Sequence, residues 1–374
     1  MPPLSVPTRA VPDYAGWVAV GRGYTRRLRV AGVAVATPAP PLAVADPALV
    51  GRSLVELHCG ALDQPGFDLA ITGPLAVTLS RFGMVWQEGH LLTSAEILPD
   101  YVMPQLHAAP AHFFTGPRAL PCRAEHRPGF VFSGWGMHVF GHFLIETLPR
   151  LLLARALPHW LDGALPVLDR AMPDWLQVIL REQFGIGESN AIWFDSRIEQ
   201  LDLARAWLIP NLLRPGGFHP LAAGLLEAFG QGLAGPAQQG GARLFIARGD
   251  YHNPHSAQRC LENEAALAAM AEAEFGCTVV YPQDLSFTEQ VACFSRAELV
   301  LGQAGSAPHL ALFAPKGARV GVLRFMAPDQ SFIAALRGQK IGYLTEGISE
   351  TAPGQFRIDP EKFRMFGAAM LAID

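Results

Sequence analysis

Four ionisable side chains recur at four-residue intervals in an otherwise mostly apolar segment: His138, His142, Glu146 and Arg150. Residues four apart share one face of an α-helix, so the spacing predicts a polar stripe on a helix over about residues 139–156. Such groups on an apolar helix are expected to line a cleft or to pair with one another. They favour proton transfer, because histidine changes its charge near neutral pH.

His142 is the first candidate for a general base, and Glu146 either orients it or acts as the base itself. Arg150 is expected to pair with Glu146 one helical turn earlier, or to bind substrate. His138 is a candidate for substrate binding, with a structural histidine as the competing interpretation. The two histidines could also bind a metal ion with Glu146 as the third ligand, although HxxxH alone is a weak motif.

A second segment, Leu299 to Leu323, predicts a strand, a turn of small residues, a short helix over 307–313 and another strand. Open α/β sheets bind phosphates with this unit, because glycines let the backbone approach a ligand and helix-start N–H groups attract anions. Gly305, Ser306 and His309 are therefore candidates for phosphate binding. An ordinary turn in a Rossmann-like domain is the alternative interpretation.

A third segment supplies arginine: a strand over residues 244–247 ends at Arg248, and Arg259, Asn263 and Glu264 lead into the next helix. Only three of the 29 basic residues are lysines, so an anionic substrate would meet mainly arginine, whose planar guanidinium suits phosphate. Arg248 and Arg259 are candidates for phosphate binding, and Asn263 and Glu264 for binding sugar or ribose hydroxyls. A surface salt bridge and an exposed helix start are the competing interpretations.

Together and in this order, the three segments resemble glycosyltransferase family 61. The family's GHFxxExLPRL-like helix is matched at Gly141, His142, Phe143, Glu146, Leu148, Pro149, Arg150 and Leu151. Its SR…RxxNE segment is matched at Arg248, Arg259, Asn263 and Glu264, with Ala247 in place of the usual serine. Its third segment, G-x-x-G-[AS]-x-x-x-N-x-x-F-x-P-x-G, is matched at Gly302, Gly305, Ser306, Phe313, Pro315 and Gly317. Ala304 and Leu310 stand where many members have His and Asn.

The resemblance implies an inverting glycosyltransferase of the GT-B type, with the nucleotide sugar on the C-terminal domain and the acceptor on the N-terminal domain. We expect a UDP-linked donor and, as in capsule-type bacterial members, a polysaccharide or glycoconjugate acceptor. Glycosyl transfer must stabilise the departing diphosphate and remove a proton from the acceptor hydroxyl. No two aspartates lie two residues apart, so the metal-binding DxD motif is absent. We therefore expect arginine and helix-start N–H groups to stabilise the diphosphate, without a metal or other cofactor.

Two other functions remain open. A metal-dependent hydrolase would use His138, His142 and Glu146, and metal bound to the purified protein would favour it. A degenerate family member would bind a glycan or a partner in capsule assembly without catalysis. Ala304 and Leu310 support that second hypothesis, and nucleotide binding by the C-terminal half would argue against it.

Composition limits the class of protein. The 374 residues are 50% hydrophobic and 17% charged, which is typical of folded globular domains. A net charge of −4 makes nucleic acid an unexpected partner. The N-terminal region lacks a signal-peptide pattern, and prolines or turns interrupt the longest uncharged runs, so we expect a cytoplasmic protein without a membrane span. Peripheral membrane association stays open, and five widely spaced cysteines fit free thiols.

The order of predicted elements indicates an α/β protein with two domains, 1–215 and 216–374, divided in a region rich in proline and glycine. In the first domain, the pattern predicts a turn at Gly73-Pro74 and a helix over residues 173–184.

In the second domain, predicted strands such as 319–323 alternate with predicted helices such as 260–275, which indicates a parallel, doubly wound sheet. With the resemblance, the expected architecture is GT-B-like: two Rossmann-like domains facing a cleft. Residues 281–284 follow a strand of the second domain, at the sheet edge where ligands bind, so we expect the nucleotide base there.

Overall fold

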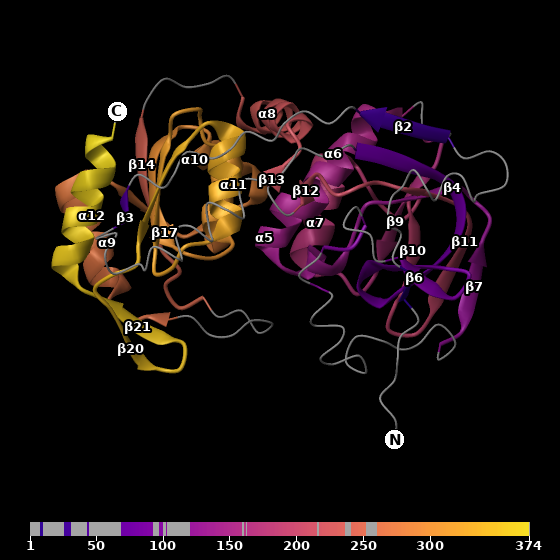
Figure 1. The fold of residues 1–374 in the computed structure, drawn as a ribbon, viewed down its shortest axis with the longest axis horizontal. Coiled ribbons are helices and arrows are strands. Elements are labelled where there is room, and N and C mark those ends of the chain that lie inside the picture. Colours follow the sequence, from indigo (N-terminus) through magenta and orange to yellow (C-terminus); the bar gives the residue numbers. More distant parts are fainter. Residues whose placement is uncertain are drawn as a thin grey trace. The chain divides into compact units, whose positions relative to one another are not determined.

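The computed structural model describes residues 8–9, 26–30, 43–44, 69–92, 97–99, 102, 120–158, 161, 163–214, 217–235, 241–251 and 260–373. These residues form two compact units, each considered by itself (Figure 1). Unit 1 contains the described residues up to Arg214 except 43–44, and unit 2 contains 43–44 and the described residues from Gly217 onward. The division lies next to the predicted boundary at residue 215. Residues 43–44, which the sequence assigns to the first domain, belong instead to the second unit.

Unit 1 is built on a mixed sheet. Its 12-residue strand β4 (Leu69–Ser80) pairs antiparallel with β2 (Arg26–Val30), β5 (Met84–Gln87) and β11 (Gln200–Leu208). Beyond β5 the sheet continues through β6 (His90–Leu92) to β1 (Thr8–Arg9). On the other side, β11 pairs parallel with β7 (Cys122–Glu125) and β8 (Gly129–Val131), and parallel pairing continues to β9 (Leu165–Asp169) and β10 (Ile192–Phe194). The sheet is therefore mixed, with antiparallel pairing around β4 and parallel pairing from β11 to β10.

One predicted turn is wrong. The sequence predicts a turn at Gly73-Pro74, but strand β4 runs through both residues. A Cβ atom at Gly73 would lie 2.6 Å from the carbonyl oxygen of Ala206 and 2.7 Å from the ring of Trp207. Glycine is therefore needed here because it lets β4 and β11 approach closely, and not because the chain reverses.

The predicted helix over residues 139–156 is present, with two differences. It runs from α5 (Phe140–His142) through a π-helical turn, η3 (Phe143–Thr147), into α6 (Leu148–Ala156). His138 is not on this helix. Val139 has extended backbone angles and separates the helix from the preceding 3-10 turn η2 (Trp135–His138), which contains His138. The predicted stripe is therefore shorter at its start. The π turn also adds a residue to the helical ladder before Arg150.

The described part of unit 1 also contains the helical elements η1 (Arg81–Gly83) and α7 (Asp174–Phe184). The 3-10 turn η1 joins β4 to β5, and helix α7 follows β9. α7 begins directly after Pro173, where the sequence predicts a helix start, and Gly185 closes it with a φ of 64°. Among the helices that the structure describes, none combines the length and apolar character needed to span a bilayer.

Unit 2 contains the predicted parallel sheet. Its strands run in the order β16 (Thr278–Val280), β14 (Ala242–Ile246), β17 (Ala297–Gln303), β18 (Arg319–Leu323), β19 (Lys340–Leu344) and β3 (Ala43–Val44). All five pairings are parallel. The ends of these strands therefore meet at one edge, where α/β sheets commonly bind ligands.

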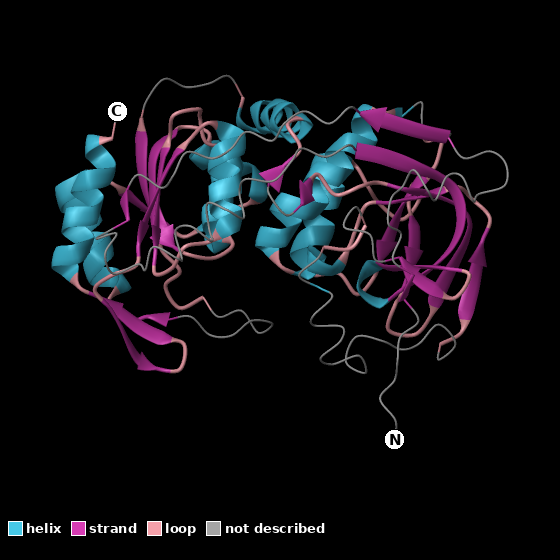
Figure 2. Ribbon diagram, viewed as in Figure 1, coloured by secondary structure: helices cyan, strands magenta, loops and turns pink. Residues whose placement is uncertain are grey.

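Helices cover both faces of this sheet (Figure 2). Helices α9 (Glu264–Phe275) and α12 (Pro360–Ala372) lie on one face, and α10 (Phe287–Phe294) and α11 (Pro328–Arg337) lie on the other. α10 starts at the only capping box among the described helices, formed by Ser286 and Glu289. Unit 2 also contains α8 (Leu221–Ala234) and the 3-10 helices η5 (Pro282–Asp284) and η6 (Ala307–Phe313).

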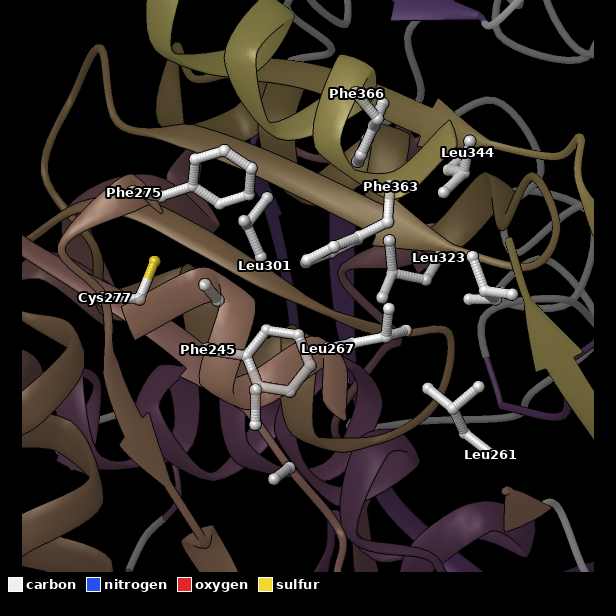
Figure 3. Close-up of a cluster of buried hydrophobic side chains, with 14 of the residues drawn as sticks. Phe245, Leu261, Leu267, Phe275, Cys277, Leu301, Leu323, Leu344, Phe363 and Phe366 are labelled. Atoms are coloured by element: carbon white, nitrogen blue, oxygen red, sulfur yellow. The ribbon is translucent and has the colours of Figure 1, made fainter. Parts of the chain in front are cut away.

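One core of unit 2 lies between the sheet and the α9–α12 pair. Figure 3 shows part of it, with Phe245, Leu301 and Leu323 of the strands meeting Phe363 and Phe366 of α12. Phe245 and Phe363 pack edge to face at 5.9 Å, and both are almost fully buried. Burial of this apolar surface holds the α9–α12 pair against the sheet.

A small three-stranded sheet adjoins this core. The sequence predicts a helix from Cys260, but β15 (Cys260–Leu261) pairs with β21 (Gln355–Ile358), which in turn pairs antiparallel with β20 (Ile348–Ala352). The helix begins only at Glu264. This prediction failed because pairing with a hairpin about 95 residues later overrides local helix propensity.

Candidate active site

In unit 1, the side chains of His142 and Glu146 form a hydrogen-bonded pair. The Nδ1 atom of His142 lies 2.9 Å from the Oε1 atom of Glu146. The histidine side chain is 30% exposed and the glutamate side chain only 8%. An ionised carboxylate only accepts hydrogen bonds, so in a neutral imidazole paired with ionised Glu146, Nδ1–H donates and Nε2 carries the lone pair. The pair can therefore accept a proton at Nε2 while the buried carboxylate holds the ring.

A glycine that the sequence analysis did not single out borders this pair. A Cβ atom at Gly136 would lie 2.4 Å from the Cβ of His142 and 3.0 Å from Oε2 of Glu146. Gly136 is buried in η2, so the backbone of this turn packs directly against the pair. The two glycines at 134 and 136, just before His138, are the sequence signal that could have indicated this contact.

His138 is the last residue of the turn η2 that packs against the pair, and it contacts Phe82 of η1. The two rings meet edge to face, with centroids 5.6 Å apart. Phe82 has a φ of 61°, which is unusual for a bulky residue, and the guanidinium of Arg81 lies 4.7 Å from its ring centroid. His138 thus packs on an aromatic side chain from a distant part of the sequence. Its role in substrate binding stays a prediction.

Arg150 is only 2% exposed. Its Nε atom donates to the carbonyl oxygen of Ile209, 2.8 Å away, just beyond the end of β11. Its Nη1 atom would lie 3.2 Å from a Cβ atom at Gly134. The described geometry thus ties helix α6 to the sheet. Direct substrate contact by Arg150 remains untested, and its burial favours a positioning role.

In unit 2, the carboxylate of Glu264 organises the ends of two neighbouring strands. Its Oε2 atom accepts hydrogen bonds from the backbone N–H groups of Arg248 (3.0 Å) and Gly249 (2.7 Å), directly after β14. Its Oε1 atom accepts from Nε2 of Gln303 at the end of β17, at 2.8 Å. Glu264 is 9% exposed, so the predicted sugar-binding carboxylate is occupied in fixing the backbone of Arg248.

Asn263 and Arg259 are the other residues of this segment that the sequence predicts to bind substrate. The side-chain amide of Asn263 makes two hydrogen bonds to Ile358, donating to its carbonyl oxygen at 2.7 Å and accepting from its N–H at 3.1 Å. This amide therefore joins the start of α9 to β21. Arg259 lies outside the residues that the structure describes. Their roles in substrate binding stay predictions.

The glycine turn after β17 leads into η6, a seven-residue 3-10 helix rather than an α-helix. Gly305 borders open space, and Ser306 and His309 are half-buried. The two departures from the family pattern lie at buried positions, with Ala304 3% and Leu310 0% exposed. Phosphate binding by the turn stays a prediction, and a short 3-10 helix offers less dipole support than an α-helix.

An exposed aromatic side chain lies beside Arg248. Tyr281, directly after β16, is 40% exposed, and its Cε1 atom would lie 3.1 Å from a Cβ atom at Gly249. Gln283 donates from Nε2 to the carbonyl oxygen of Arg248, at 3.0 Å. The segment expected to meet a nucleotide base therefore packs against the Arg248 backbone.

The described residues also bear on thiol and metal chemistry. Burial raises the pKa of the Cys277 thiol to about 11, so this cysteine is protonated at neutral pH. Within the described residues, no three or more His, Cys, Asp or Glu side chains cluster with metal-site geometry.

A known protein family matches the part of the chain that contains these residues. Residues 140–321 match the family model Glycosyltransferase 61. The glycosyltransferase 61 match covers just under half of the chain and includes the His142–Glu146 pair as well as Arg248 and Glu264. It supports the family resemblance and, with it, glycosyltransferase activity. No curated protein matches the chain.

Proposed function

We propose that this protein is an inverting, metal-independent glycosyltransferase that moves a sugar from a UDP-linked donor to a hydroxyl of a bacterial polysaccharide or glycoconjugate. The observation that carries the proposal is the His142–Glu146 pair, in which a buried carboxylate holds a partly exposed imidazole at 2.9 Å. The glycosyltransferase 61 match supplies the reaction class. Inversion, the donor and the GT-B arrangement are parts of the proposal.

In the proposed reaction, Nε2 of His142 takes the proton from the acceptor hydroxyl. The acceptor oxygen forms a bond to the anomeric carbon of the sugar as the bond from that carbon to the diphosphate oxygen breaks. The electron pair of the broken bond leaves with the nucleoside diphosphate. Glu146 holds the ring in the required tautomer and stabilises the imidazolium that forms. One displacement of this kind needs one base and no enzyme nucleophile, and inverts the anomeric centre.

We assign donor binding to unit 2. Arg248 follows β14 at the carboxyl edge of a parallel sheet, and its backbone is held by Glu264 and Gln283. Tyr281 beside it offers an exposed ring to a nucleotide base. Fixed donors aimed at a departing diphosphate stabilise the charge that develops there, as a metal ion otherwise would. A cytoplasmic location fits the use of nucleotide sugars and belongs to the same proposal.

The test is a thermal-shift panel of UDP, GDP, CDP and their sugars, with and without EDTA, on the wild type and Arg248→Ala. A ligand in excess over its Kd raises the melting temperature by mass action. We expect one nucleotide to raise it, the shift to persist in EDTA, and the mutant to lose it.

The other outcomes separate the rival functions. No shift with any nucleotide would contradict donor binding and favour a degenerate glycan- or partner-binding protein. A shift that requires divalent metal would contradict metal independence and favour the hydrolase that uses His138, His142 and Glu146. Activity assays with the selected UDP-sugar and candidate glycans then measure release of the nucleoside diphosphate.

A further inference from the structure

The carboxyl edge of the unit 2 sheet carries a second arginine that lies outside the family match. Arg324 directly follows β18, three residues past the end of the matched segment. Strands β14, β17 and β18 are consecutive in the sheet, so Arg248 and Arg324 leave the edge two strands apart. Neighbouring strands are about 4.8 Å apart, so the two backbone positions are separated by roughly 10 Å. The end of β17 and the glycine turn lie between them.

The backbone of Arg324 is strained. Its φ is 97°, and among the described non-glycine residues only Phe82 and Glu88 also have a positive φ. Strained backbone conformations of this kind cluster at active sites and ligand-binding positions. The strained residue is held in place, because its N–H donates to the carbonyl oxygen of Leu344 at 2.9 Å.

The strain determines where the guanidinium lies. Leu323 faces the core cluster that also contains Phe356 (Figure 3 shows Leu323). In a regular strand the next residue would point to the opposite face. Instead, the Cζ atom of Arg324 lies 4.3 Å from the ring centroid of Phe356, so two successive side chains face the same side. The positive φ turns the arginine back over the aromatic ring.

Arg324 also differs from other arginines of unit 2 in how its charge is paired. Five other arginines of unit 2 form ion pairs with glutamates: Arg243, Arg319, Arg337, Arg357 and Arg364. No carboxylate among the described residues forms an ion pair with Arg324, which is half-buried. The nearby carboxylate of Glu264 is engaged by three neutral donors. A strained, stacked cation without an acidic partner is preorganised for an anion.

We propose that Arg324 binds the distal phosphate of the nucleoside diphosphate, whereas Arg248 meets the phosphate nearer the nucleoside. This inference rests on the proposed donor binding by unit 2. The order of the phosphate contacts follows the order of the strands along this edge of the sheet. Tyr281 follows β16, Arg248 follows β14 and Arg324 follows β18. A base at Tyr281 places the first phosphate near Arg248 and the second toward Arg324. The two long side chains then converge on one diphosphate from either side of the glycine turn.

The test compares binding of UDP and UMP, or the matching pair for the base that the panel selects, to the wild type and Arg324→Gly. Glycine accepts a φ of 97° without strain, so this variant should fold and, without ligand, melt no lower than the wild type. A charged hydrogen bond lost to the distal phosphate should raise the Kd for UDP about 10- to 100-fold. The Kd for UMP should stay within about twofold, since UMP lacks that phosphate.

Arg357→Gln is the matched control, because Arg357 is on the neighbouring strand β21, is 59% exposed and pairs with Glu262. It removes the same charge and should leave both Kd values unchanged. Equal losses for UDP and UMP in Arg324→Gly, or no loss for UDP, would overturn the assignment. If UDP fails to bind the wild type, the proposed function fails first. If only Arg248→Ala loses UDP, the proposed function stands and this inference fails.

Discussion

Gly136 lies so close to His142 that a Cβ atom at residue 136 would come within 2.4 Å of the histidine Cβ. Real Cβ atoms do not approach this closely, so a larger side chain must displace either the turn or the imidazole. The backbone of the turn occupies the space beside the imidazole, and so limits the positions that the ring can take.

Gly136→Ala should therefore lower transfer while leaving donor binding intact. A displacement near 1 Å at a reacting group costs about 100-fold in rate. We expect a fall in kcat of roughly that size, with the UDP-dependent thermal shift unchanged. Gly187→Ala is the control in the same unit, since a Cβ atom there meets nothing within 4 Å. A Gly136→Ala enzyme with wild-type kcat would show that the contact does not position the base.

His142→Ala and Glu146→Gln test the assignment of base and orienting group. Loss of a general base costs about 10²- to 10⁴-fold in kcat, and His142→Ala should fall in that range. Glu146→Gln should have a smaller effect, because an amide oxygen can still accept from Nδ1 but carries no charge to stabilise the imidazolium. Both should bind UDP as the wild type does. A larger loss in Glu146→Gln than in His142→Ala would identify the glutamate as the base.

A third prediction concerns Glu264, which satisfies two backbone N–H groups and the amide of Gln303. Glu264→Ala leaves these donors without an acceptor and should lower the free energy of unfolding by about 2–3 kcal/mol, as measured by urea denaturation. Glu264→Gln should cost less than half of that, because Gln303 can turn its amide to match. Glu272→Ala, at an exposed position of the same helix, is the control.

Exchanging the two side chains tests whether Glu264 and Gln303 interact directly. Gln303→Glu places two carboxylates in contact in a buried site and should destabilise the protein. The double variant Glu264→Gln with Gln303→Glu restores one carboxylate and one amide, and should recover stability relative to Gln303→Glu. Additive losses in the double variant would show that the two side chains do not interact directly.

A fourth prediction follows from Glu125, whose carboxylate accepts from Nε, Nη2 and the backbone N–H of Arg127. These bonds lower the pKa of Glu125 from 4.5 to about 2. A lowered folded-state pKa stabilises the protein above the unfolded value, and this contribution is lost as the pH falls toward 2. Glu125→Gln should therefore melt below the wild type at pH 7, and the gap should narrow below about pH 4.5. The effect is modest, because Arg127 is exposed and salt screens the pair. A gap that widens on acidification would contradict it.

The sheet of unit 2 was largely predictable from the sequence. β18 begins and ends at the predicted residues, because a short apolar run between Gly317 and the following polar segment leaves little choice. The 260–261 strand was predicted as helix, and the β20–β21 hairpin was not predicted at all. Both elements depend on pairing between segments far apart in the chain, and the local sequence pattern carries no information about such pairing. Gly73 shows the same limit, since its partner is Trp207.

The candidate site was predictable where its contacts are local. The four-residue spacing of His142 and Glu146 indicated that their side chains meet, and they do. It did not indicate the contact with Gly136, the π turn, or the bond from Arg150 to Ile209, which depend on packing or on the sheet. Arg324 gave no signal, because positive φ is expected of glycine and asparagine and not of arginine.

Strand β3, formed by residues 43–44, has a consequence for how the protein can be made. It pairs with β19, and β19 is synthesised about 300 residues later. A ribosome therefore finishes nearly the whole chain before the sheet of unit 2 can gain its last strand. A C-terminal fragment that starts at residue 216 would leave β19 as an open edge, the kind of surface that recruits other chains into aggregates. Attempts to produce unit 2 alone should therefore supply this early segment as well.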